Sequence, residues 1–351
     1  MAHELDFANG RYSVAAVGGA TSMWHGLGQE IFPDDSVEDI QRKAGLLYTV
    51  EKGQAFYFQN GAGELREVPG TEFTYRSDTG APLGAVSDSR FKLDGRQPRD
   101  VVEFFRDFLR GNGLAIETAG ALRGGRSVWC LAKLGPDFRH LAPGDDATDG
   151  YVRLSTGFDG NRATMLDGTT VRVVCANTER MADAKTGKAG GYRVSHASDL
   201  DPRALQAAFG LLGDRWRITC EEWRAMQARR VSDEEARVFF CNVADVDPDQ
   251  VGKVGKDGKP VLSTRTLNGL QALADAYRNG PGAQLPSACG TAYGLLNAVT
   301  YIADHKATVR DTYGDGPALA RLASSQDGTG AAMKARAREY AAALAGVRVA
   351  A

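Results

Sequence analysis

The sequence lacks most of the signatures that mark metal, disulfide and cofactor proteins. Its five cysteines are far apart and odd in number, and no Cys-x-x-Cys pair occurs, so neither a zinc knuckle nor a disulfide framework is expected. The five histidines form no pair at ligand spacing, which argues against a metal site and metal-dependent hydrolysis. The sequence contains no P-loop, HExxH or GxSxG motif and no GxGxxG turn after a strand, so we expect no cofactor.

Long apolar runs are also missing. No segment approaches the roughly 20 apolar residues of a membrane-spanning helix, and no basic region precedes the first apolar stretch. We therefore expect a cytoplasmic protein with no membrane partner. A strong excess of one charge is absent too, because the formal net charge is −2. Any surface that attracts an anion must therefore be local.

What the sequence does contain is an ordinary supply of core residues: 43% are hydrophobic and 25% charged, as in folded globular proteins. Glycine and proline interrupt residues 1–35, which we expect to form an irregular arm. Residues 36–198 carry short β-branched or aromatic segments between Gly, Asn and Asp turns, together with amphipathic segments. Residues 199–351 carry helical patterns, interrupted by a Gly/Lys-rich loop near 251–260.

These patterns predict an α+β fold. We expect an antiparallel-rich sheet with packed helices in the N-terminal two thirds and a mainly helical C-terminal third. Ser36 is predicted to begin one helix, and Pro98 begins an amphipathic one. In the C-terminal part, the Asp201-Pro202 pair and the capping box that opens at Ser232 predict two further helix starts.

Residues 297–305 mix apolar and polar side chains at helical spacing. Four polar side chains lie near one side of the expected helix, at i, i+4, i+7 and i+8, namely Asn297, Tyr301, Asp304 and His305. A stripe of amide, phenol, carboxylate and imidazole suits an internal hydrogen-bond network, and it also suits a ligand, nucleic-acid or catalytic site. Adjacent residues on one helix rarely chelate a metal well, so no metal is assigned to it.

Residues 171–178 are predicted to form a strand and the turn after it. With a period of two, Val171 and its alternate neighbours share one face, and Arg172 lies on the other. We therefore expect Arg172 to point away from the core, where it could meet phosphate. Asn177 is either the N-cap of a helix over 179–185 or a member of a polar site.

Basic residues are concentrated between 151 and 193, where seven Lys or Arg stand against four Asp or Glu, a local charge of +3. A second basic cluster lies in residues 90–99. If the two lie side by side, they build a basic groove suited to a phosphate backbone, although scattered surface arginine is the simpler alternative. The expected phosphate contacts are Arg153, Arg162 and Arg172. The expected stacking residues are Phe158 or Tyr151, and Phe91 and Tyr192 lie beside the same clusters.

Six pieces of the chain, in order and spread over most of its length, resemble a phage/plasmid-like protein family that carries a domain of unknown function numbered 932. They are residues 1–5, 24–28, 76–84, 124–129, 172–178 and 297–305. One departure is in the last piece, where the family often places an aromatic one position after Tyr301. The resemblance implies a mobile-element protein whose gene travels with replication and recombination functions. It further implies a relationship to single-strand-annealing proteins, which build a basic groove from a sheet and a helix and often assemble as homo-oligomeric rings.

The leading hypothesis is a non-catalytic protein that binds single-stranded nucleic acid, such as a strand-annealing factor of a phage or plasmid. The first alternative is an enzyme acting on a nucleotide or other small molecule, with Asn297, Asp304 and His305 at its centre, which predicts a closed polar pocket. The second alternative is a protein that sequesters a host factor, which predicts a long exposed apolar patch.

Overall fold

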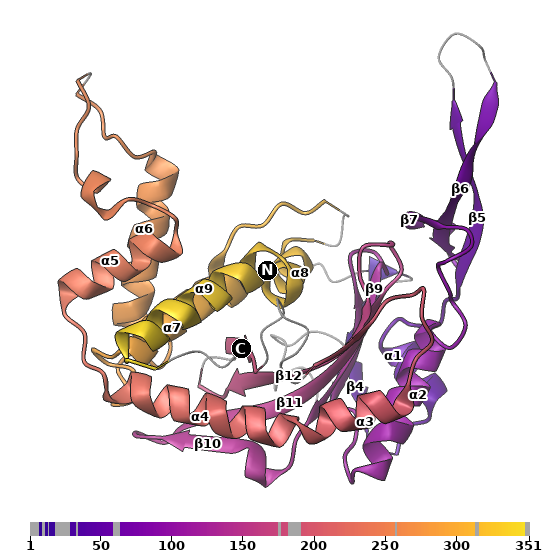
Figure 1. Cartoon of the computed structure of the whole chain (residues 1–351), viewed down its shortest axis with the longest axis horizontal. Helices are drawn as coiled ribbons and strands as arrows, with labels where there is room; N and C mark the ends of the chain where they lie inside the picture. Colours follow the sequence, from indigo (N-terminus) through magenta and orange to yellow (C-terminus); the bar gives the residue numbers. More distant parts are fainter. Residues whose placement is uncertain are drawn as a thin grey trace.

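The central feature of the fold is a curved, mainly antiparallel β-sheet. The computed structural model describes residues 7–8, 11–12, 14–17, 29–32, 34–58, 64–174, 177–181, 191–256, 258–312 and 316–347. Helices cover the sheet and extend beyond one end of it (Figure 1). The fold is α+β, with the helices concentrated in the C-terminal part, as the sequence predicts.

The strands of this sheet form one ordered path. Across the sheet they run β13 (Asn177–Arg180), β12 (Thr164–Arg172), β11 (Asp146–Gly157), β9 (Ser127–Lys133), β8 (Thr118–Leu122), β3 (Val14–Val17) and β4 (Gln29–Ile31). Two shorter strands lie off this path: β10 (Arg139–Ala142) pairs with β11, and β14 (Tyr192–Val194) pairs with β12. Only β3 and β4 pair in parallel among these described strands. A separate pair is formed by β1 (Phe7–Ala8) and β2 (Arg11–Tyr12).

Both faces of the sheet are buried, and β9 shows how alternation achieves this. Val128 and Cys130 belong to the main hydrophobic core, whereas Trp129 and Leu131 belong to a smaller core on the other face. Helices α1 (Val37–Lys43) and α2 (Pro98–Gly111) pack into the main core, and Ala323 of α8 (Pro317–Asp327) packs into the smaller one. The main core continues without a break into the C-terminal helices.

The remaining helices begin largely where capping chemistry predicts. They are α3 (Pro202–Gly210), α4 (Leu212–Ala228), α5 (Asp233–Val243), α6 (Thr264–Asn279), α7 (Ala292–Tyr301) and α9 (Thr329–Leu344), with short turns η2 (Pro136–Phe138) and η3 (Pro248–Gln250). Ser36 and Ser232 complete capping boxes, and Asp201 caps α3. The chain continues from α7 into a π-helical turn, η4 (Ile302–Lys306). Within the described ranges, we find no helix that is both long and apolar enough to cross a membrane.

A second, three-stranded sheet leaves the body of the protein at one end (Figure 1). It consists of β5 (Val50–Phe58), β6 (Leu65–Arg76) and β7 (Pro82–Ser87). Because β7 pairs only with the second half of β6, the outer halves of β5 and β6 form a two-stranded ribbon. Large apolar side chains are exposed along it, namely Phe56, Tyr57, Phe58 and Leu65. We call this segment the ribbon.

One prediction about local structure is wrong. Asn177 does not cap a helix, because Asn177–Arg180 is strand β13, paired with β12 in the register Arg172 to Asn177. The described part of the chain ends at Met181 here, so the rest of the expected helix over 179–185 lies outside it. The strand extends the sheet toward α7, and this brings the two polar motifs together.

Candidate nucleic-acid interface

The two polar motifs meet where β13 lies against α7 and η4. The Asn177 side-chain amide donates to the Thr300 hydroxyl at 2.9 Å and to the Asn297 carbonyl oxygen at 3.1 Å. The backbone N–H of Thr178 donates to Asp304 Oδ2 at 2.6 Å. Residues separated by more than a hundred positions in the sequence therefore share one hydrogen-bond network. Asn177 and Asp304 of the predicted polar site take part through their side chains, whereas Asn297 takes part through its backbone carbonyl oxygen and its side-chain amide donates to the Tyr293 carbonyl oxygen.

A lysine from the last helix completes this network. Lys334 Nζ donates to Asp304 Oδ1 at 2.8 Å, to Ser325 Oγ at 2.7 Å and to the Thr178 carbonyl oxygen at 2.8 Å. The Lys334 and Asp304 side chains are only 8% and 6% exposed. The adjoining cavity has a volume of about 30 Å³, room for one or two water molecules but not for a substrate. The cluster is therefore a buried, mutually bonded network, and it does not form the closed polar pocket that the enzyme alternative predicts.

The other two residues of the predicted stripe lie apart from this network. The rings of Tyr301 and His305 pack on each other, with centroids 5.1 Å apart, and Lys306 Nζ lies 5.8 Å from the Tyr301 ring centroid. Both aromatic side chains are partly exposed. Among the residues that the structure describes, no group of three or more His, Cys, Asp or Glu side chains is placed to hold a metal ion.

The expectation that Arg172 points away from the core is wrong. Its guanidinium forms a two-pronged ion pair with Asp146, with Nε to Oδ1 and Nη2 to Oδ2 both at 2.7 Å. The two side chains are 3% and 0% exposed, and Ser287 Oγ donates to the same carboxylate at 2.6 Å. The face of β12 opposite Val171 is covered by the segment before α7, whose Gly282 carbonyl oxygen also accepts from Arg172. Arg172 therefore cannot meet a phosphate without unfolding this region.

Three more predicted contact residues are buried. Arg153 pairs with Asp167, which lies directly opposite on β12, through two hydrogen bonds of 3.0 and 2.9 Å. Tyr151 is 3% exposed within the smaller core, and Phe158 is fully buried in the main core. Phosphate contact and base stacking require exposed side chains, so none of the three is available for the predicted role. Of the five predicted contacts, Arg162 alone keeps access to solvent, with a side chain 25% exposed.

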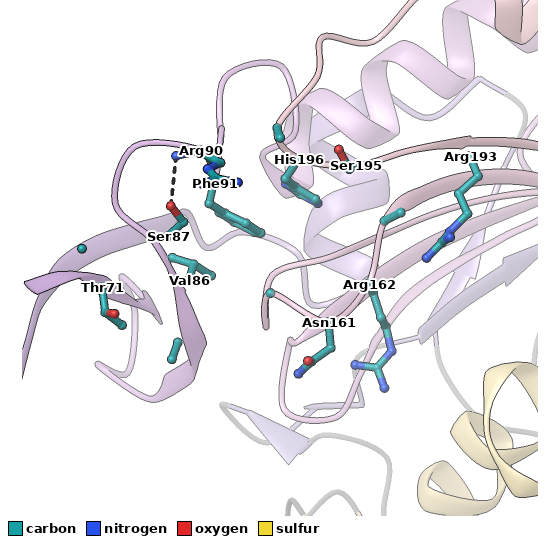
Figure 2. Close-up of a pocket in the computed structure, with 15 residues that line it drawn as sticks. Thr71, Val86, Ser87, Arg90, Phe91, Asn161, Arg162, Arg193, Ser195 and His196 are labelled. Atoms are coloured by element: carbon teal, nitrogen blue, oxygen red, sulfur yellow. Dashed lines mark hydrogen bonds between the residues drawn. The ribbon is translucent and has the colours of Figure 1, made fainter. Parts of the chain in front are cut away.

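Arg162 lies in a groove of about 600 Å³ between the base of the three-stranded sheet and the β11–β12 turn, which we call the ribbon groove (Figure 2). Its walls come from β6 and β7, the turn after β7, the β11–β12 turn and the segment around β14. Three arginines line it, namely Arg90, Arg162 and Arg193, and its described lining includes no carboxylate. The groove brings Arg90 of the second basic cluster beside Arg162 and Arg193 of the first, and of these Arg162 was an expected phosphate contact.

Two of these arginines are free to bind an anion. Arg90 and Arg193 are exposed, and within the described residues neither guanidinium has a hydrogen-bond or ion-pair partner. Arg162 is held at the groove by Asp159 and, at 3.4 Å, by Asp327 of α8. Figure 2 shows Phe91 and Arg193 on opposite sides of the groove. The lining therefore combines guanidinium groups with an aromatic ring.

The Phe91 ring is fixed by stacking on His196. The two ring centroids are 4.2 Å apart, and the planes differ by 3°. Burial lowers the pKa of His196 to about 4, so the imidazole is neutral near pH 7. Its Nδ1 lies 3.0 Å from the Lys92 carbonyl oxygen, which can only accept, so Nδ1 carries the proton. Because the imidazole is neutral, the positive charge of the groove comes from its arginines alone.

Close backbone contacts hold the groove walls in place. A Cβ on Gly84 of β7 would lie 2.6 Å from backbone atoms of Asp159, and one on Gly160 would lie 2.6 Å from the Ala85 carbonyl oxygen. The Thr74 hydroxyl donates to the Phe158 carbonyl oxygen at 2.5 Å. Gly160 also has a φ of +76°, which favours glycine at this turn. The groove is therefore a preformed feature of the fold.

Comparison with known proteins gives a family and nothing finer. A family model described as Domain of unknown function (DUF932) matches residues 82–326. This span holds the β11–β12 turn, the segment around β14 and both polar motifs. None of the curated proteins matches the chain, and none of the solved structures does.

Proposed function

The chain belongs to the family of this domain of unknown function, and we propose that it binds single-stranded nucleic acid in the ribbon groove. The observation that carries the proposal is the lining itself, in which three arginines surround an aromatic ring with no carboxylate among the described lining residues. Arginine binds phosphate through paired N–H groups, and aromatic rings stack on bases of any sequence. Both halves of a nucleotide therefore find a partner in one groove.

A single strand suits this groove better than a duplex. Stacking on Phe91 requires a base with an open face, and in a duplex both faces of an internal base are already occupied by its neighbours. A volume of about 600 Å³ suits a ligand of roughly one or two nucleotides, in the ordinary range of small-molecule sites. Phosphate contacts carry no sequence information and stacking accepts any base, so we expect little sequence preference.

The cellular role that we propose is strand annealing during recombination or replication of a phage or plasmid. A factor of this kind binds strands through their phosphates and leaves the pairing edges of the bases accessible. Stacking on Phe91 with phosphate contacts from Arg90 and Arg193 fits this requirement. Assembly of several chains into a homo-oligomer would align many such grooves along one strand.

The proposal predicts that Arg90→Ser/Arg193→Ser weakens binding of labelled oligo-dT on the order of 10- to 100-fold, because two hydrogen bonds are lost and each is worth about 0.5–1.5 kcal/mol net of the water that replaces it. Fluorescence anisotropy with a salt titration measures this. The slope of log K against log salt should fall in magnitude by about 1.4, since each phosphate contact to a single strand contributes about 0.7.

Affinity should not rise as the pH falls from about 8 to 6, since neutral His196 gains no charge there.

A matched control removes the same charge elsewhere. Arg110→Ser/Arg265→Ser replaces two exposed arginines of α2 and α6 that lie outside the groove. This variant should bind oligo-dT like the unaltered protein. Equal losses in the two double variants would show a general effect of net charge and would overturn the assignment to the groove. Absence of binding to any oligonucleotide at low salt would overturn the proposed function itself.

A second candidate function rests on the ribbon. Phe56 and Phe58 are 54% and 60% exposed, and Leu65 opposite Phe58 is 69% exposed. An apolar patch of this kind suits a protein partner such as a host factor. Capture of one defined protein by the full chain, abolished by Phe56→Ser/Phe58→Ser with oligo-dT binding unchanged, would favour this function for the ribbon.

A further inference from the structure

A second groove with similar chemistry lies between β10 and one face of α4. Its volume is about 450 Å³. The α4 residues that line it share one side of the helix, because Trp216, Arg217, Cys220 and Arg224 follow Gly213 by three, four, seven and eleven positions. We call it the α4 groove. It shares no lining residue with the ribbon groove.

The α4 groove has an aromatic floor. The rings of Phe138 and Trp216 line it, with centroids 5.9 Å apart and planes at 45°. His140 lies beside them, and burial, with a smaller effect of the Arg224 charge, lowers its pKa, so it is neutral near pH 7. The floor is therefore uncharged. Its partly exposed Phe138 ring offers aromatic surface to a base, and the buried Trp216 packs beside that ring.

Arginines form the rim of this groove. Arg224 is exposed and has no hydrogen-bond or ion-pair partner among the described residues. Arg217 is 61% exposed and pairs with Glu221 at 2.9 Å on the helix surface, and Arg139 reaches Asp149 only at 3.4 Å, where Lys133 is closer at 2.7 Å. The exposed pair of Arg217 with Glu221 contributes little, so phosphate can replace that carboxylate. Asp137 is the one carboxylate among the described lining residues.

Strand β11 sets the distance between the two grooves. Its first residues pair with β10 beside the α4 groove, and its end at Gly157 leads into the turn that lines the ribbon groove. The 12 residues of β11 span roughly 40 Å at about 3.3 Å each. An extended single strand reaches roughly twice the about 3.4 Å spacing of a stacked strand, so an oligonucleotide of about four nucleotides covers at most roughly 28 Å and fills one groove and not both.

We propose that the α4 groove is a second site for single-stranded nucleic acid, so that each chain holds two segments at once. This rests on the proposed function, because the ribbon groove supplies the first site. The recognition chemistry is the same in both, with phosphate on the exposed arginines and a base against the aromatic floor. Two sites on one chain hold two strands near each other, or two points of one longer strand, at high effective concentration.

The test counts short oligonucleotides bound to each full-length chain by native mass spectrometry, with an oligo-dT of about four nucleotides, at the short end of the usual site size. We expect two per chain. Gly213→Glu should reduce the number to one, because a Cβ at Gly213 meets no atom within 4 Å and the added carboxylate enters the groove without a clash. Gly213→Gln, of the same size and neutral, should keep two. Arg217→Ser/Arg224→Ser should also leave one.

Each outcome decides between the two proposals. Two oligonucleotides per chain in all α4-groove variants would overturn the second site. A single oligonucleotide on the unaltered protein, lost with Arg90→Ser/Arg193→Ser, would leave the proposed function standing and remove this inference. A single oligonucleotide lost with Gly213→Glu would support the α4 groove and overturn the ribbon groove. No binding to the unaltered protein would overturn both.

Discussion

Replacement of Arg172 by alanine is expected to lower the free energy of unfolding by about 3–5 kcal/mol, the usual cost of removing one partner from a buried ion pair. The loss leaves the Asp146 carboxylate fully buried, with the Ser287 hydroxyl still bonded to it but no counter-charge. It also removes the guanidinium that lies 5.5 Å from the centre of the Tyr293 ring. The midpoint of urea unfolding measures the effect.

Two variants make this result interpretable. Arg172→Ala/Asp146→Ala removes the unpaired charge as well, so it should be less destabilised than the sum of the two single variants. Arg110→Ala, at an exposed position, should change stability by less than about 0.5 kcal/mol. An unchanged unfolding midpoint for Arg172→Ala, together with loss of oligo-dT binding, would contradict this account and favour the phosphate contact that the sequence suggested.

Lys334→Met is expected to cost a similar amount, about 3–5 kcal/mol. Methionine fills nearly the same volume, so the main loss is the positive charge against Asp304 and the hydrogen bonds that the ammonium donates to Ser325 and Thr178. Since this ammonium links α9 to β13, the terminal helix should become less protected against amide hydrogen exchange along with the global loss. Urea unfolding and exchange measured by mass spectrometry test both effects.

A double-mutant cycle separates the ion pair from packing. Asp304→Asn alone removes the charge but keeps the shape, and Lys334→Met/Asp304→Asn removes both charges. We expect a favourable coupling energy of about 1–3 kcal/mol between the two sites, because they are in direct contact. If Lys334→Met unfolds within about 1 kcal/mol of the unaltered protein, the network does not hold the two motifs together as described.

Strand periodicity and capping chemistry predicted much of the fold. The alternation in β9 places Val128 and Trp129 in different cores, and the sequence shows that alternation directly. Ser36 and Ser232 satisfy local hydrogen bonds within four residues, so their helices depend little on distant contacts. The family was predicted from short motifs, and the match over residues 82–326 confirms it.

Burial of the arginines was harder to predict, because the sequence does not show whether an arginine is exposed to water or paired with a buried carboxylate. For Arg153 a signal existed. A hairpin turn centred on Gly160 pairs each residue with the one that lies the same number of positions on the other side of the turn. Arg153 and Asp167 form one of these pairs. For Arg172 no local signal exists, since Asp146 lies two positions beyond its directly paired residue, Thr148, and a distant segment provides the cover.

The candidate site combined predictable and unpredictable parts. Arg90, Phe91 and Arg193 were recognisable as members of basic and aromatic clusters, but their meeting depends on the contact between β7 and the β11–β12 turn. That contact depends on Gly84, because a Cβ there would clash with the Asp159 backbone. The sequence shows the glycine but does not show which segment packs against it. Lys334 was missed because a single lysine in an alanine-rich helix resembles an ordinary exposed one.

The most direct measurement of where nucleic acid binds is photo-crosslinking of the full chain to a single-stranded oligonucleotide carrying 5-iodouracil, followed by mass spectrometry of the crosslinked peptides. This base couples to aromatic side chains on which it stacks. The account predicts a crosslink at Phe91, lost when the oligonucleotide is competed with unlabelled oligo-dT and reduced in Arg90→Ser/Arg193→Ser. Crosslinks confined to the ribbon residues Phe56 and Phe58, with none at Phe91, would contradict it.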